Sequence, residues 1–160
     1  MIEIDHLCET KQAAELTLTL PFQLRQKSRF KTTLDDGQDA GVILPRGRLL
    51  RGGDCLKTSD GKIVEVIAAE ESVTTIYSEQ PLQLARASYH LGNRHVSLQI
   101  TEKWIRYLHD HVLDEMIEGL GLTVTVEKAP FEPEAGAYGG GHRHGDDHDH
   151  GDHHAHSHEH

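Results

Sequence analysis

The chain has 160 residues, of which 36% are hydrophobic, and its 26 acidic and 16 basic side chains give a formal net charge of −10. This apolar fraction is below the roughly 45–50% usual for globular domains, so part of the chain is expected outside any core, and the acidic charge argues against non-specific binding to nucleic acid or anionic membranes. With no apolar run near the roughly 18 residues of a membrane span, no secretory signal at the start, and two cysteines too few and too isolated for a disulfide framework, we expect a protein of the reducing cytoplasm.

The first part of the chain, residues 1–72, carries patterns typical of β-strands. Residues 15–20 alternate apolar and polar side chains, residues 29–34 do so more loosely, and residues 62–69 resemble a longer strand. Turn signals separate these segments: Asp36-Gly37, Arg51-Gly52-Gly53-Asp54 and Asp60-Gly61. We predict a small all-β domain without a long helix.

The second part, residues 73–135, alternates strand and helix patterns. In chain order we predict a strand over 73–77, a helix from Pro81 to the stop at Gly92, strands over 95–100 and 104–108, a helix capped by Asp110 and ending before Gly121, and a strand over 122–126. The second helix carries one apolar stripe: Val112, Leu113, Met116, Ile117 and Leu120. This order is typical of a ferredoxin-like βαββαβ domain, so the predicted class is α+β.

Residues 136–160 form a histidine-rich tail. It has no large apolar side chain after Tyr138, so it cannot offset the entropy of ordering its backbone, and we predict disorder. A purification tag and an inert solvated tail are the alternatives, but aspartates and glycines interrupt the histidines. Because imidazole is a good ligand for nickel, zinc and copper, we predict metal binding by His142, His144, His148, His150, His153, His154, His156, His158 and His160.

Three histidines outside the tail are further candidates. His109 and His111 lie at the predicted junction of strand and helix, and in an extended segment their imidazoles share one side, which favours an auxiliary metal site. Two histidines cannot complete a structural zinc site alone, so both could equally lack a metal. The position of His95 at the start of a predicted strand favours, by itself, a structural hydrogen-bonding role.

Several kinds of site are missing from the sequence. It contains no phosphate-binding Gly-x-x-x-x-Gly-Lys-Ser/Thr loop, no Gly-x-Ser-x-Gly elbow and no His-Glu-x-x-His motif, so we predict no catalytic residues and no enzyme. Residues 35–39 lack the spacing of a calcium loop and are predicted as a turn. Arg46, Arg48 and Arg51 are expected to frame turns or to meet a protein partner.

Three segments together resemble the UreE family of urease accessory proteins. They are Leu44-Pro45-Arg46-Gly47-Arg48-Leu49-Leu50-Arg51-Gly52-Gly53-Asp54, Leu91-Gly92-Asn93-Arg94-His95, and Pro130-Phe131-Glu132-Pro133-Glu134-Ala135-Gly136-Ala137-Tyr138 before a histidine-rich end. The resemblance implies a homodimeric cytoplasmic nickel metallochaperone for urease maturation. It also implies a β-rich N-terminal peptide-binding domain and a ferredoxin-like metal-binding and dimerisation domain.

The same resemblance assigns roles to the candidate residues. His95 matches the central nickel ligand of the family, which overrides its structural interpretation, and His109 and His111 match a peripheral pair present in some members. The tail implies extra capacity for Ni(II), which is cargo, and Zn(II) or Cu(II) are competing ions. The implied partners are the urease apoprotein and the accessory GTPase.

Two alternatives stay open at the level of sequence. One is a prolyl-isomerase-type chaperone with a metal-binding tail, although three Phe, four Tyr and one Trp supply an aromatic pocket poorly. The other is a general divalent-metal buffer, in which the folded part only carries the tail.

Overall fold

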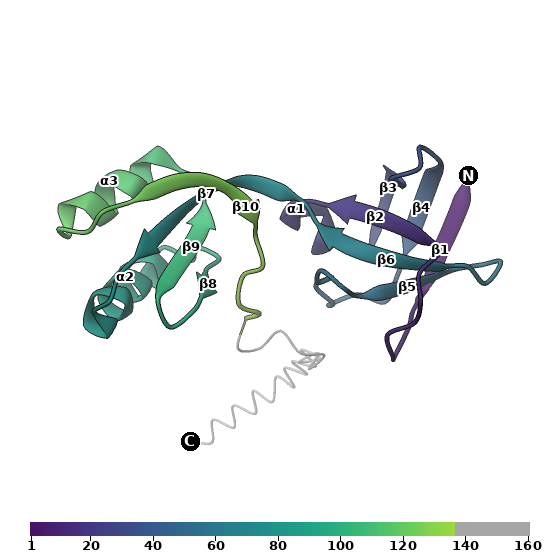
Figure 1. Cartoon of the computed structure of the whole chain (residues 1–160), viewed down its shortest axis with the longest axis horizontal. Helices are drawn as coiled ribbons and strands as arrows, with labels where there is room; N and C mark the ends of the chain where they lie inside the picture. Colours follow the sequence, from purple (N-terminus) through teal and green to yellow (C-terminus); the bar gives the residue numbers. More distant parts are fainter. Residues whose placement is uncertain (137–160) are drawn as a thin grey trace, which may run out of the picture.

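The computed structural model describes residues 1–136, and the predicted tail lies outside this part of the chain except for Gly136. Two sheets divide the described residues into a first unit, residues 2–68, and a second unit, residues 70–130. Figure 1 shows the two units side by side, with the long strand β7 running from the end of the first unit into the second. Within residues 1–136, no helix has the length and hydropathy needed to cross a membrane.

The first unit is a six-stranded sheet with the order β2-β6-β5-β1-β4-β3. The pairs β1–β4 and β2–β6 are parallel, and the other pairs are antiparallel. Its helix α1 (Phe22–Arg25) is a single turn, so the prediction of strands without a long helix is correct here. The strands are β1 (Ile2–Leu7), β2 (Leu16–Leu20), β3 (Arg29–Thr33), β4 (Asp39–Ile43), β5 (Cys55–Thr58) and β6 (Ile63–Ala68).

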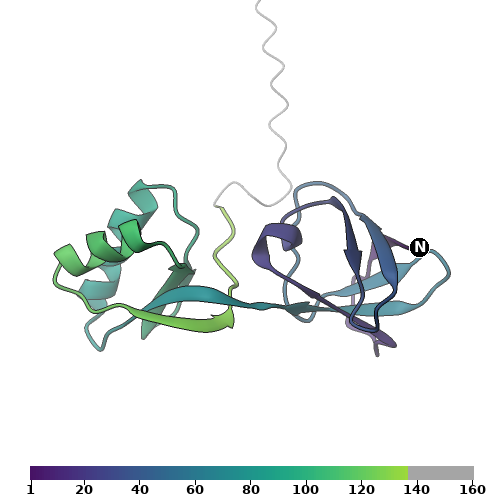
Figure 2. The same cartoon turned by 90° about the horizontal axis from the view of Figure 1, so that it is seen from above.

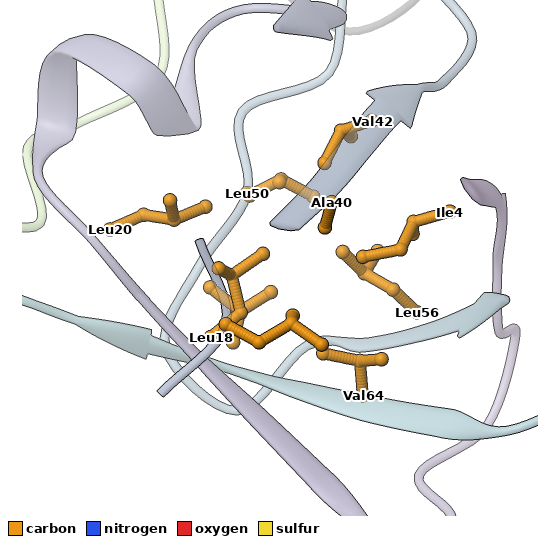
Figure 3. Close-up of a cluster of buried hydrophobic side chains, with 10 residues drawn as sticks. Ile4, Leu18, Leu20, Ala40, Val42, Leu50, Leu56 and Val64 are labelled. Atoms are coloured by element: carbon orange, nitrogen blue, oxygen red, sulfur yellow. The ribbon is translucent and has the colours of Figure 1, made fainter. Parts of the chain in front are cut away.

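The core of the first unit comes from the alternation that predicted its strands. Leu18 and Leu20 of β2 are fully buried, and the threonines between the leucines point to the other face of the sheet. The buried cluster in Figure 3 contains Ile4, Leu18, Leu20, Leu34, Ala40, Val42, Leu50, Leu56, Val64 and Val66.

One carboxylate connects the two edge strands of this sheet. Asp35, in the turn after β3, accepts hydrogen bonds from the Thr17 hydroxyl at 2.7 Å, the Thr19 hydroxyl at 2.9 Å and the Thr19 N–H at 3.1 Å. The turn continues through Gly37, whose φ of 94° is in the left-handed region that glycine tolerates. The predicted turn is therefore present over residues 35–38, and Asp39 already begins β4.

The second unit is a four-stranded antiparallel sheet with the order β10-β7-β9-β8. Both helices contribute to one buried cluster with Ile76, Ile105 and Tyr107, so they pack on the same face of the sheet. Separate strand and strand–helix units agree with the predicted α+β class. The elements are β7 (Glu70–Tyr77), α2 (Pro81–Asn93), β8 (Gln99–Ile100), β9 (Trp104–Leu108), α3 (His111–Gly119) and β10 (Thr125–Pro130).

Three strand boundaries in the second unit differ from the prediction. The predicted strand over 95–100 is reduced to two residues, because residues 94–96 complete the end of α2. The last strand begins at Thr125 because Leu122 and Val124 first pack against the core. β7 begins earlier than predicted, at Glu70, because β10 pairs with it as far as that residue.

The apolar stripe of α3 is narrower than predicted. Leu113, Met116 and Ile117 face the core, whereas Val112 is 50% and Leu120 is 42% exposed. These two residues lie at the ends of a short helix, where the sheet no longer covers them. The sequence pattern identified the helix but overestimated its buried face.

The sequence suggested two isolated cysteines, but in the fold they are neighbours. Leu7 of β1 pairs with Leu56 of β5, and the N–H of Cys8 donates to the carbonyl of Cys55 at 2.8 Å, so the cysteines are cross-strand neighbours. Cys8 is half-buried and Cys55 is buried, and both are free thiols.

Candidate metal centre

His95 forms part of the turn that ends α2. The N–H of His95 donates to the carbonyl of Gly92 at 3.0 Å, and the N–H of Val96 donates to that of Leu91 at 3.3 Å. This pair of bonds is the Schellman motif, which places a left-handed residue after the helix, usually glycine. His95 fills that position with φ 57° and is the only non-glycine residue of positive φ within residues 1–136.

The imidazole of His95 is available to a ligand. His95 is exposed, and within residues 1–136 its ring has no hydrogen-bond partner, which gives no support to a structural hydrogen-bonding role. It lines an open pocket of about 470 Å³ together with Ser88, Leu98 and residues 134–136. The N–H of Glu134 donates to the carbonyl of Leu98 at 2.6 Å, so the chain runs toward the tail beside His95.

His109 is held by a buried carboxylate. Its Nδ1 lies 3.1 Å from Oδ2 of Asp114 and 3.1 Å from the hydroxyl of Thr74, and its side chain is 37% exposed. Because the Thr74 hydroxyl donates to Asp114, its oxygen accepts from Nδ1–H of His109. This leaves the Nε2 lone pair free, and a hydrogen-bonding partner on the other ring nitrogen is the usual arrangement of metal-binding histidines. The structure therefore orients His109 as a ligand histidine is oriented.

Asp114 itself is fixed by two more donors. The hydroxyl of Tyr107 donates to its Oδ1 at 2.5 Å, and the hydroxyl of Thr74 donates at 2.8 Å. Burial, and then the hydrogen bond to Asp114, raise the pKa of the Tyr107 phenol, so the phenol remains a donor. This network was not predicted from the sequence, although an aspartate within the apolar pattern of α3 was a visible signal.

His111 is the first residue of α3 and is exposed. Between the two histidines, the Asp110 carboxylate accepts from the N–H groups of Val112 at 2.9 Å and Leu113 at 3.4 Å, so the predicted N-cap is correct. Because this carboxylate is occupied by capping, the metal-binding potential of this segment rests on the two imidazoles.

The described residues do not form a complete metal site in one chain. Within residues 1–136, no three or more His, Cys, Asp or Glu side chains lie close enough together to hold an ion, so His95, His109 and His111 do not form one cluster. Further ligands would have to come from another copy of the chain or from the tail. The predicted tail ligands are outside the described residues: His142, His144, His148, His150, His153, His154, His156, His158 and His160.

Comparison with known proteins gives a consistent family for both units. Residues 2–69 match the family model of the UreE urease accessory protein N-terminal domain, and residues 71–160 match that of its C-terminal domain. A protein from Alkalilimnicola ehrlichii named urease accessory protein UreE is 63% identical over 127 residues, covering 79% of this chain and 78% of the relative.

Two other relatives carry the same name. The protein from Citrobacter koseri is 54% identical over 149 residues, covering 91% of this chain and 98% of the relative. The protein from Proteus mirabilis is 56% identical over 126 residues, covering 79% of this chain and 78% of the relative. The similarity therefore extends over both units.

Proposed function

The chain belongs to the UreE family of urease accessory proteins, and from this premise we propose that it is a nickel metallochaperone. It binds Ni(II) as cargo and delivers it to the urease apoprotein, together with the other accessory proteins, including the accessory GTPase. It acts in the cytoplasm as a homodimer and is not an enzyme. Zn(II) and Cu(II) compete for the same donors.

The conformation of His95 is the observation that carries this proposal. A left-handed residue after a helix is usually glycine, because a Cβ there costs about 1 kcal/mol. His95 adopts φ 57°, and its exposed imidazole contributes no hydrogen bond to the described fold. His95 therefore makes its backbone conformation less favourable, and its side chain adds no hydrogen bond to the fold. Such a residue is most simply explained by a function.

The nickel site is proposed to lie on the axis of the dimer. One imidazole cannot hold a divalent ion tightly, but at a two-fold interface a residue near the axis meets its own copy. The side chain of Ile100, which lines the same pocket as His95 and is 45% exposed, would be covered by such an interface. Two His95 imidazoles then supply half of a four-ligand site, and the remaining positions stay exchangeable, as release to a partner requires.

The other candidate ligands take auxiliary roles in this proposal. His109, oriented by Asp114, and His111 form a peripheral site, and the tail histidines add capacity and complete the central site. Residues 1–72 form the partner-binding domain, residues 73–135 the metal-binding and dimerisation domain, and residues 136–160 the metal-binding tail. The strand order β10-β7-β9-β8 supports a ferredoxin-like assignment for the second of these.

Nickel titration with parallel measurement of oligomeric state tests the proposal. A chain truncated after Tyr138 should remain a dimer and bind one tight ion per dimer. His95→Ala in that background should remove this ion and urease activation while the dimer persists, and His109→Ala with His111→Ala should cost less. His6→Ala is the matched control, because His6 is a surface histidine of the first unit with 73% of its side chain exposed.

Two results would contradict the proposal. If the His95→Ala dimer still binds one nickel ion with undiminished affinity, His95 is not the bridging ligand. If truncation after Tyr138 abolishes all specific binding, the chain is a general metal buffer whose capacity resides in its tail.

A further inference from the structure

The segment that follows β10, residues 131–136, lies between the two units and is called the strap here. Figures 1 and 2 both show it, in yellow-green, running between the two sheets. Phe131 is fully buried and packs edge-on against Phe22 of the first unit, with ring centroids 5.4 Å apart. The N–H of Gly52 donates to the Glu132 carboxylate at 2.8 Å. The first unit therefore holds the start of the strap.

The second unit holds the rest of the strap and directs it toward His95. Glu134, Ala135 and Gly136 line the same pocket as His95, so the last described residues of the chain lie at that pocket. Two N–H groups of the strap donate to the second unit: Glu132 to Oε1 of Gln99 at 3.0 Å and Glu134 to the carbonyl of Leu98 at 2.6 Å.

Arg25 is the residue on which the first unit and the strap converge. Its side chain is fully buried, and its Nε and Nη1 donate to the carbonyls of Leu20 and Leu50, both at 3.1 Å. Its Nη2 donates to the carbonyl of Phe131, and Nη1 lies 3.6 Å from the Glu132 carboxylate. The first unit thus supplies two acceptors, and the strap supplies the other two.

The burial of Arg25 makes docking of the strap energetically important. Burial lowers the pKa of the Arg25 guanidinium, and the carboxylates of Glu132 and Glu71 oppose that shift. A buried charge is costly unless it is paired and hydrogen-bonded. If the strap left, Arg25 would lose the Phe131 carbonyl and the Glu132 carboxylate together, so the charge itself favours the docked strap.

We propose that Arg25 is a positioning residue that latches the strap, and thereby fixes the start of the tail at the His95 pocket. The latch follows from the contacts alone, whereas its effect on nickel rests on the proposed function. His142 is six residues beyond Gly136, but twelve beyond Pro130. Because effective concentration falls roughly as the −3/2 power of linker length, release of the strap should lower it about threefold for one tail ligand and about eightfold for two.

The test combines Arg25→Met with removal of the tail. Methionine keeps an apolar stem but has no donor and no charge. Hydrogen exchange should accelerate in the strap and remain unchanged in α3. Nickel affinity at the His95 site should fall about threefold to eightfold in the full chain, and should not change in the chain truncated after Tyr138. A purely structural effect would reduce affinity in both backgrounds.

Controls address specificity and folding. Arg29→Met makes the same chemical change at an exposed position of β3 and should alter neither the exchange nor the affinity. Glu132→Ala opens the latch from the strap without removing Arg25, and should give the same tail-dependent loss with a smaller size. It provides the decisive measurement if Arg25→Met does not fold.

Distinct results would overturn the two parts of the inference. Unchanged strap exchange in both variants would show that Arg25 is no latch. If hydrogen exchange in the strap accelerates but the nickel affinity of the full chain does not fall, the latch does not position the tail. If His95→Ala leaves nickel binding of the parent chain intact, the proposed function fails, whereas the exchange measurement still tests the latch.

Discussion

At the scale of single residues, His95 occupies a left-handed backbone position at the candidate site, where glycine is usually preferred. The sequence Leu91-Gly92-Asn93-Arg94-His95 offers a glycine where a helix could end, and the prediction therefore stopped the helix at Gly92. In the structure Gly92 is still helical and His95 takes the left-handed position three residues later. Residues that violate a folding preference are expected at functional sites, so this failed prediction is informative.

The first prediction concerns the free energy of folding at this position. His95→Gly should raise the free energy of unfolding by about 1 kcal/mol, because glycine adopts positive φ without strain. The same change should remove nickel binding at the central site. Urea denaturation of the metal-free chain and nickel titration measure the two effects.

His95→Ala separates conformation from chemistry in this experiment. Alanine should lose nickel as glycine does but gain no stability, because it retains a Cβ. A glycine variant that is less stable than the parent chain would show that the imidazole contributes to folding after all.

A second prediction at this scale concerns the support of His109. Asp114→Asn should cost about 1–3 kcal/mol of stability, because the buried donors of Tyr107 and Thr74 lose a charged acceptor. It should also weaken nickel binding at the auxiliary site about tenfold to a hundredfold by releasing the orientation of His109.

The His109→Ala background provides the control for this prediction. The nickel effect of Asp114→Asn should vanish there, whereas the loss of stability should persist. An equal loss of nickel affinity with and without His109 would contradict the orienting role of Asp114.

At the scale of elements, local pattern predicted most of the strands and helices. The alternation at β2, the Pro81 start of α2 and the Asp110 cap of α3 are short-range signals, and each agrees with the structure. The errors at β8 and β10 arise because the length of a strand depends on its partner, and those partners are distant in the sequence. The contact of Asp35 with β2, which connects the two edge strands of the first sheet, was not predicted for the same reason.

The prediction at the element scale concerns how the stability contributed by the Asp35 contact depends on pH. Burial alone would raise the pKa of Asp35, but the hydrogen bonds from Thr17 and Thr19 outweigh it, so the pKa is lowered. A lowered pKa contributes stability above the unfolded value of about 3.9, and this contribution is lost as the pH falls through the folded value. Asp35→Asn should therefore cost about 1 kcal/mol at pH 7, since Asp35 is exposed and screened, and less at pH 3.

Asp39→Asn is the matched control for Asp35. It makes the same change at an exposed aspartate at the start of β4, whose carboxylate has no hydrogen bond within residues 1–136. Its denaturation midpoint should match the parent chain at both pH values. An Asp35→Asn variant whose stability deficit grows toward pH 3 would contradict the sign of the pKa shift.

At the scale of the whole molecule, little in the sequence indicates how the units are joined. Arg25 lies in a one-turn helix, 106 residues before the carbonyl of Phe131 that it binds. No periodicity connects such distant positions. The sequence therefore did not identify Arg25 as a joining residue, and Phe131 contributed only to the family resemblance. Only the folded chain shows that the first unit and the strap meet at one buried cation.

The last prediction concerns nickel on the tail, for which protons should compete. Ligation needs neutral imidazole, whose unperturbed pKa is about 6.5. Nine tail histidines, at about four ligands per ion, supply roughly two ions per chain. These ions should be released steeply between about pH 7 and pH 5, since several imidazoles are protonated together. The difference in bound nickel between the full chain and the chain truncated after Tyr138 measures this release, and a difference that stays flat over the interval would indicate carboxylate ligation instead.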